Sequence, residues 1–132
     1  MKRRGILNAE LSGALARLGR TDIVILAYCG MPLPRDVTVI DLALVHGIPR
    51  FEQVLDALLD EMIFEGCIAA EEARTAPPGA WLAARFDGIE YIPHEQLKGL
   101  STSAKLFIRT GEATPFANAA LVCGVSLRGR SL

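Results

Sequence analysis

KLFIRTGEATPFANAALVCGV, residues 105–125, joins two apolar runs through a short polar segment. The first run ends in Arg-Thr-Gly-Glu, a Thr-Pro pair follows, and one amide side chain leads into the second run. This order predicts a strand, a tight loop and a second strand. Loops held by rigid strands often carry function. The polar side chains between these two strands are Arg109, Glu112, Thr114 and Asn118.

Two kinds of role are predicted for these side chains. Arg109 and Glu112 flank Gly111, and an ion pair that shapes the loop is favoured over a direct part in catalysis. Asn118 enters an otherwise apolar strand, where an unpaired amide would cost roughly 1–3 kcal/mol. We therefore expect Asn118 to bond both to the backbone and to a ligand.

Outside this stretch, short apolar runs alternate with helical periodicity. Residues 22–27 (DIVILA) suit a strand covered on both faces, as in a parallel sheet. A helix is predicted to start at Pro49, because apolar residues follow at 51, 54, 55, 58 and 62. Further strands are expected at 37–44, 67–70 and 89–92, helices at 9–18 and 94–100, and irregular chain with one helical turn at 73–88. The pattern predicts an α/β fold, a three-layer α/β/α sandwich forming a single domain over 1–132.

Composition narrows the class of protein. The chain has 132 residues, of which 51% are hydrophobic, so it can build a core and is not disordered. A formal charge of −1 without a basic stripe argues against nucleic acid as a partner. No apolar run approaches the roughly 18 residues needed to cross a bilayer, so no membrane partner is expected. Cys29, Cys67 and Cys123 are widely spaced and odd in number, which predicts reduced thiols, no metal and a cytoplasmic location.

The segment IRTGEATPFAN, residues 108–118, resembles the C-terminal signature of the sugar mutarotase family that includes D-ribose pyranase and L-fucose mutarotase, on the ribose side. That signature runs close to IRTGE-x-(T/S)PYAN. The likeness continues in order through GILNAELSGALARLGRTD at 5–22, GMPLP at 30–34, GIPRF at 47–51 and HEQLK at 94–98. It covers nearly the whole chain.

The resemblance implies a sugar pocket with no metal and no cofactor. In the family, a histidine after the first helix and an aspartate after the first strand meet a second set of residues across a subunit boundary. Arg20 stands in the place of that histidine, and Tyr28 in the place of the aspartate. The second set corresponds here to His94, Lys98, Phe116 and Asn118, with Phe116 replacing a tyrosine. Arg20 and His94 are the catalytic candidates, and the substrate-binding candidates are Tyr28, His94, Lys98, Phe116 and Asn118.

The replacements bear on the chemistry. A guanidinium stays protonated, so Arg20 can donate hydrogen bonds but cannot accept a proton. Two roles are open for Arg20: contact with a ligand, or a surface or interface position paired with a nearby carboxylate such as Asp22. His94 is the best remaining acid and base, because imidazole titrates near neutral pH. Lys98 lies one helical turn beyond His94 and can face the same side, with a solvated lysine as the alternative.

The resemblance leaves two functions open. Mutarotation needs one group to protonate the ring oxygen and another to take the proton of the anomeric hydroxyl. The first hypothesis is therefore an isomerase, a pyranase-like mutarotase acting on a free monosaccharide such as ribose. The alternative is a catalytically impaired protein that binds a sugar or sugar phosphate. The resemblance also implies a homo-oligomer built from pentameric rings, stacked as a decamer, and residues 128–132 extend past the usual family end.

Overall fold

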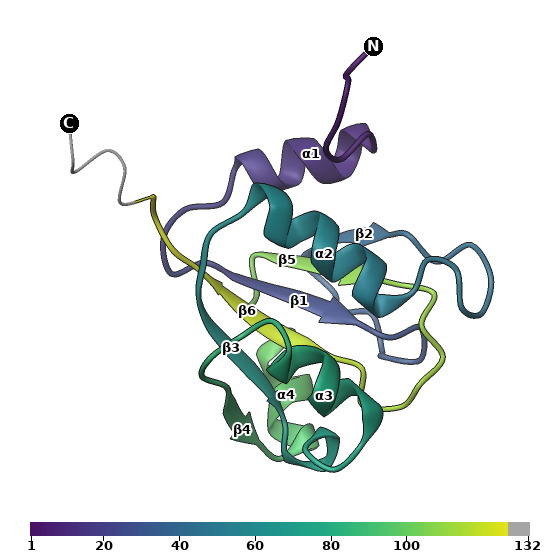
Figure 1. Cartoon of the computed structure of the whole chain (residues 1–132), viewed down its shortest axis with the longest axis vertical. Coiled ribbons are helices and arrows are strands. Elements are labelled where there is room, and N and C mark those ends of the chain that lie inside the picture. The colour runs from purple at the N-terminus through teal and green to yellow at the C-terminus, as the bar shows by residue number, and fades with distance from the viewer. Residues whose placement is uncertain (127–132) are drawn as a thin grey trace.

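The structure, a computed structural model, describes residues 1–126. Short strands and helices alternate along this part of the chain (Figure 1). The α-helices are α1 (Ala9–Ala16), α2 (Phe51–Glu61), α3 (Pro77–Ala83) and α4 (His94–Leu100), and a short 3-10 helix, η1, spans Glu71–Ala73. The strands are β1 (Ile23–Ala27), β2 (Thr38–Asp41), β3 (Phe64–Ala70), β4 (Glu90–Ile92), β5 (Leu106–Arg109) and β6 (Ala119–Cys123).

The described strands form one mixed sheet in the order β2-β5-β1-β6-β3-β4. β1 is parallel to β5, and β5 is parallel to β2, whereas β6 is antiparallel to both of its neighbours, β1 and β3. The parallel environment expected for β1 therefore exists on one side only. Because β6 runs backwards, its first residue, Ala119, pairs with Leu26 near the end of β1. The β5–β6 loop thus lies at the carboxyl edge of β1.

Both faces of this sheet are covered, as expected for three layers. Successive residues of a strand point to opposite faces, and β1 follows this rule. Val24 and Leu26 belong to the core cluster that includes buried residues of α1, α2 and α3. Ile25 and Ala27 belong to a second cluster, which contains Leu97 of α4. The α/β/α sandwich is confirmed, with α4 as the helix of the second face.

Several boundaries differ from expectation. β2 ends at Asp41 rather than at residue 44. Segment 73–88 holds a full helix, α3, where a single turn was expected. Gly79 explains the close packing of α3, since a Cβ there would lie 2.2 Å from the carbonyl oxygen of Ala73. A Pro-Pro-Gly sequence suggests a break, but here its prolines occupy the first helical turn, where they are tolerated.

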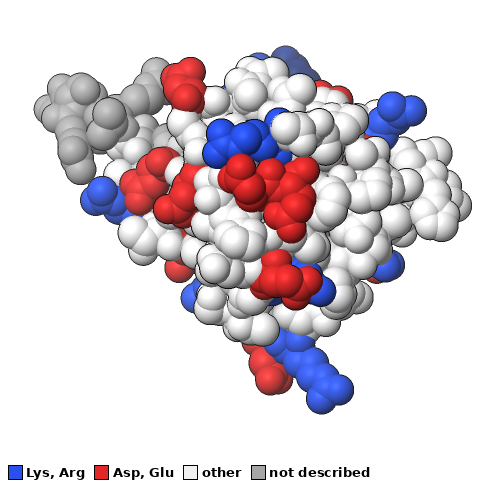
Figure 2. Space-filling view, turned by 90° about the horizontal axis from the view of Figure 1, so that it is seen from below, with Lys and Arg blue, Asp and Glu red and all other residues white. Residues whose placement is uncertain are grey.

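The surface and the thiols complete the description. Cys67 and Cys123 are buried and Cys29 is half-buried, and all three are free. Burial raises the pKa of the Cys67 thiol to about 12. On the face shown in Figure 2, acidic side chains gather near the centre beside one basic group, and most other basic side chains lie toward the rim. None of the helices within residues 1–126 has both the length and the apolar character needed to span a membrane. The extension at 128–132 lies outside the described residues.

Candidate functional site

Five of the six candidate residues converge at the carboxyl edge of β1, within one chain. Tyr28 follows β1 directly, and Asn118 directly precedes β6, which pairs with β1. The backbone N–H of Tyr28 donates to Oδ1 of Asn118 at 3.0 Å. The remaining three residues, Phe116, His94 and Lys98, come from the β5–β6 loop and from α4. Open α/β sheets commonly bind ligands at this edge.

Asn118 has half of its amide unused. Its side chain is fully buried, and Oδ1 is paired with the Tyr28 amide as described. Nδ2 is also buried, and it has no hydrogen-bond partner among the described residues. The expected bond to the backbone is therefore confirmed. Because a buried unpaired donor is costly, Nδ2 is available for an acceptor that binds at this edge.

His94 presents a second unpaired atom to the same region. It is the first residue of α4, and its backbone N–H donates to the Glu72 carboxylate at 3.0 Å. Its ring stands edge-on to the Phe116 ring, with centroids 5.2 Å apart and an interplanar angle of 87°. Nδ1 of His94 is buried and lacks a partner in the described part of the chain. The imidazole is thus oriented by its neighbours but has a free nitrogen.

Phe116 has an unusual backbone. Its φ is 65°, in the left-handed region that residues with a Cβ seldom adopt. Such strained positions cost of order 1–3 kcal/mol and tend to occur at functional sites. The backbone N–H of Asn118 donates to the Phe116 carbonyl at 2.9 Å, so the chain turns sharply between them. This turn places the Phe116 ring against His94 while the Asn118 side chain reaches Tyr28.

Lys98 lies one turn after His94 on α4 and is about one-third exposed. Its Nζ is 3.6 Å from Glu95 on the same helix. Lys98 also lines a pocket of about 210 Å³ between α4 and the loop after β1. Ser101, which sequence reasoning did not single out, lines the same pocket. The signal for it was available, because Ser101 follows His94 by seven residues and so shares its helix face.

Arg20 does not join this group. Arg20 precedes β1, whereas Tyr28 follows this strand. The five residues of β1, at about 3.3 Å each, place the two ends of the strand roughly 16 Å apart. Nε of Arg20 is 3.4 Å from the Glu65 carboxylate, at the start of β3, and its side chain is largely exposed. The alternative of a surface arginine paired with a carboxylate is therefore confirmed within this chain, with Glu65 rather than Asp22 as the partner, since the Asp22 carboxylate accepts from the Gly19 amide.

Tyr28 contacts Asn118 through its backbone N–H within one chain. The family pattern groups the Tyr28 side chain with the residue at position 20, across a subunit boundary from Asn118, and this arrangement stays a prediction. The Tyr28 ring lies over Gly30, where an added Cβ would be 2.8 Å from ring atom Cε2. A glycine at position 30 therefore allows the ring its present position.

The Arg-Thr-Gly-Glu segment is structural. Nε of Arg109 donates to the Asp41 carboxylate at 2.9 Å, so the expected Arg109–Glu112 ion pair is wrong. These hydrogen bonds from Arg109 hold the pKa of Asp41 below its ordinary value. The carboxylate of Glu112 is buried, and it accepts from the amide of Phe51, the first residue of α2, at 3.1 Å. The segment thus ties β5 to β2 and to α2.

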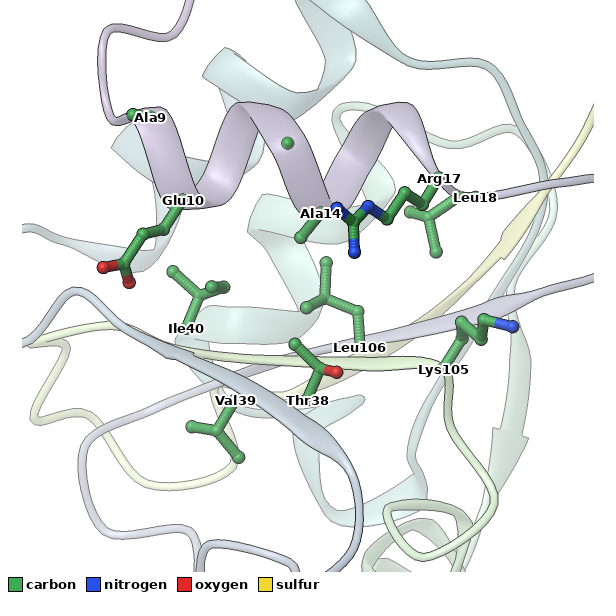
Figure 3. Close-up of a pocket in the computed structure, with 11 residues that line it drawn as sticks. Ala9, Glu10, Ala14, Arg17, Leu18, Thr38, Val39, Ile40, Lys105 and Leu106 are labelled. Carbon is green, nitrogen blue, oxygen red and sulfur yellow. The ribbon is translucent and has the colours of Figure 1, made fainter.

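A larger pocket lies elsewhere, between α1 and the strands β2 and β5. Its volume is about 490 Å³, and Figure 3 shows the side chains of Glu10, Arg17 and Lys105 around apolar walls. None of its lining residues carries a buried unpaired side-chain atom in the described structure. No cluster of three or more metal-ligating side chains occurs within residues 1–126. The unpaired atoms of His94 and Asn118 therefore make the carboxyl edge of β1 the better candidate site.

Comparison with known proteins shows the family of this chain. The model of the RbsD / FucU transport protein family matches residues 1–126. A D-ribose pyranase of Streptomyces avermitilis is 53% identical over 127 residues, which cover 95% of this chain and 98% of the relative. A D-ribose pyranase of Geobacillus kaustophilus is 46% identical over 98% of both chains.

Solved structures give the same result. The chain is similar to Bacillus subtilis RbsD complexed with D-ribose, with a TM-score of 0.90 and 43% identity over 96% of this chain and 99% of that one. The fucose mutarotase of Streptococcus pneumoniae, solved with L-fucose, has a TM-score of 0.75 at 21% identity over 91% of this chain and 94% of that one. The second likeness concerns the fold alone.

Proposed function

Because this chain belongs to the RbsD / FucU transport protein family, we propose that it is a mutarotase that interconverts the ring forms of a free monosaccharide such as ribose. Its relatives are D-ribose pyranases, and a similar structure contains D-ribose. The observation that carries the proposal is the pair of buried, unpaired atoms, His94 Nδ1 and Asn118 Nδ2, at one edge of the sheet. Together they offer a proton carrier and a hydrogen-bond donor to one small polar ligand.

The chemistry assigned to these groups is proton transfer. Ring opening requires a proton on the ring oxygen and loss of the proton from the anomeric hydroxyl. His94 carries one of these protons through Nδ1, and water completes the exchange. Asn118 Nδ2 and Lys98 Nζ donate to sugar oxygens, and the aromatic ring of Phe116 packs against the sugar. A well-placed acid–base group is worth roughly 10²–10⁴-fold in rate.

Arg20 can contribute to the sugar site only when copies of the chain associate. Within one chain it lies at the opposite edge of the sheet from His94, so it reaches a site only if a neighbouring copy brings its amino edge there. We place the protein in a homo-oligomer, in pentameric rings or a decamer, and in the cytoplasm. In this arrangement Arg20 donates hydrogen bonds and positive charge to the sugar and does not carry a proton.

Two observations favour a second candidate, a protein that binds a sugar or a sugar phosphate without catalysis. Arg20 cannot accept a proton, and it is paired with Glu65. Phe116 lacks the hydroxyl of the family tyrosine. Under this alternative Asn118 and Lys98 hold the ligand, and its ring forms exchange no faster than in water.

Proton exchange spectroscopy separates the two functions. The exchange rates among the ring forms of ribose are measured without protein, with wild type and with His94→Ala. A mutarotase speeds the exchange, and His94→Ala removes about 10²-fold or more of this acceleration. His46→Ala is the matched control, because His46 is exposed in the loop after β2 and should leave the rate unchanged.

Ligand shifts without faster exchange would establish the binding protein and refute the mutarotase. In that case Arg20→His tests the cause. Exchange that appears in Arg20→His assigns the loss of activity to this one position. Exchange that stays at the rate of water means that Tyr28 or Phe116 also prevents catalysis.

A further inference from the structure

A third buried side-chain atom without a hydrogen-bond partner, besides those of His94 and Asn118, belongs to Ser101 in the described structure. The 210 Å³ pocket is formed by the loop after β1 and the last turn of α4, and its lining residues are Met31, Pro32, Leu33, Pro34, Lys98, Ser101 and Thr102. Ser101 is 5% exposed, and its Oγ is buried without a hydrogen-bond partner in the described structure. A buried unpaired hydroxyl is costly, so this atom lacks the partner that its position calls for.

This pocket continues the site along α4. His94, Lys98 and Ser101 are spaced i, i+4 and i+7, so they share one face of the helix. At about 1.5 Å per residue, Ser101 lies roughly 10 Å along the axis from His94, with Lys98 between them. The opposite wall begins at the site as well, because the Met31 amide donates to the Tyr28 carbonyl at 3.2 Å. The pocket is therefore an extension that shares Lys98 with the candidate sugar site.

The lining suits a neutral group better than a phosphate. Four of the seven lining residues are methionine, leucine or proline, and the positive charge of Lys98 is offset by Glu95 at 3.6 Å. The pocket also lies at the carboxyl end of α4, where exposed carbonyls disfavour an anion. A short carbon group that ends in one hydroxyl matches these walls, because its carbon packs on the apolar side and its oxygen meets Ser101 Oγ.

We propose that this pocket receives the C5 hydroxymethyl group of the furanose form of the sugar, with Ser101 Oγ hydrogen-bonded to O5. This inference rests on the proposed mutarotase function. When ribopyranose opens, the C1–O5 bond breaks, O5 gains a proton and the anomeric hydroxyl loses one, giving the aldehyde. When O4 then attacks C1, O4 loses its proton and the carbonyl oxygen gains one. In the furanose product C5 and O5 lie outside the ring, so the site must accommodate this hydroxymethyl group beside the ring.

The test compares two exchange rates in one sample of ribose. Both exchanges pass through the open aldehyde, but only pyranose–furanose exchange ends with a closed ring that carries C5 and O5 outside it. In Ser101→Ala we expect the protein-dependent pyranose–furanose rate to fall about fivefold, the equivalent of one hydrogen bond of about 1 kcal/mol. The anomeric rate should change less than twofold. Ser103→Ala is the matched control, because the exposed Ser103 lies outside the pocket lining and its hydroxyl already donates to the Leu100 carbonyl at 3.3 Å.

Equal slowing of both rates, or no slowing of either, would overturn the assignment. Ribose 5-phosphate that binds more tightly than ribose, with the advantage lost in Ser101→Ala, would instead make the pocket a phosphate site. If wild type speeds neither exchange, the proposed function fails separately, and binding of methyl ribofuranoside against methyl ribopyranoside then tests the pocket. A furanoside preference that disappears in Ser101→Ala supports the inference, and the absence of such a preference refutes it.

Discussion

The two halves of segment 109–118, which runs from the last residue of β5 to the start of β6, are built in opposite ways. In the first half, Arg109, Thr110 and Glu112 all have partners for their side chains, from three different parts of the fold. In the second half, Phe116 has a left-handed backbone and Asn118 keeps a buried amide unpaired. These ten consecutive residues thus form two parts. The first is a scaffold whose polar side chains have partners without a ligand, and the second is a site in which a buried polar group lacks one. Substitutions in the first half should cost stability, and those in the second half should cost binding.

The largest effect is expected for Gly111→Ala in the scaffold half. A Cβ at Gly111 would lie 2.2 Å from the carbonyl oxygen of Ile48, a backbone atom that cannot turn aside. We expect a loss of about 3 kcal/mol in the free energy of unfolding, measured by urea denaturation at fixed protein concentration. Gly13→Ala in α1 is the control, because a Cβ there meets nothing within 4 Å and should be neutral or stabilising.

Glu112→Ala should follow, with a loss of about 2 kcal/mol. It removes a buried acceptor from the Phe51 amide at the start of α2 and from the Thr114 hydroxyl. Glu112→Gln keeps an acceptor oxygen and should recover part of this loss. Urea unfolding measures both variants. If the free energy of unfolding were unchanged and sugar binding were lost, Glu112 would belong to the binding site rather than to the scaffold.

Asn118→Ala should show the reverse pattern. The variant removes the free donor Nδ2, so affinity for the sugar should fall roughly 5- to 50-fold, measured by NMR titration. Stability should change by only about 1 kcal/mol, because the lost bond to Tyr28 is partly offset by removal of an unpaired buried group. A stability loss as large as that of Gly111→Ala would erase the distinction between the two halves.

The smallest effect is expected for Asp41→Asn, below about 1 kcal/mol, because the Asp41–Arg109 pair is more than a third exposed on the carboxylate side. Arg109 lowers the folded-state pKa of Asp41 below its ordinary 3.8. The stabilisation is therefore complete above about pH 4 and disappears as the pH falls through the folded-state value. The difference between wild type and variant should shrink over this range in urea unfolding, and a difference that grows on acidification would contradict the pair.

Much of the fold could be predicted from the sequence, because strands and helices have different hydrophobic periods. The stripe from Phe51 to Leu58 and the apolar run at 22–27 gave α2 and β1 almost residue by residue. The order of the strands in the sheet could not be predicted from the sequence, because apolar runs do not specify which strands pair. The antiparallel insertion of β6 between β1 and β3 is such a case.

The candidate site, like the fold, could be predicted in part: its residues could be identified from the sequence, but their contacts could not. The resemblance of HEQLK and IRTGEATPFAN to the family signature indicated His94, Lys98 and Asn118, and in the structure they lie with Phe116 at one edge. Contacts between distant segments could not be predicted in this way. Arg109 pairs with Asp41, 68 positions away, rather than with its neighbour Glu112, and Arg20 pairs with Glu65 rather than Asp22. A charged side chain has several opposite charges nearby in sequence, and only the fold decides between them.

The position of the last two strands has a consequence for biosynthesis. β5 separates β2 from β1, and β6 separates β1 from β3, yet both strands are made last. A nascent chain that ends before residue 106 has only β3 and β4 able to pair, so most of its apolar strand surface stays uncovered. The sheet can close only after β6, which ends at Cys123, has left the ribosome, so chains terminated before this strand keep apolar surface exposed and become substrates for chaperones and proteases.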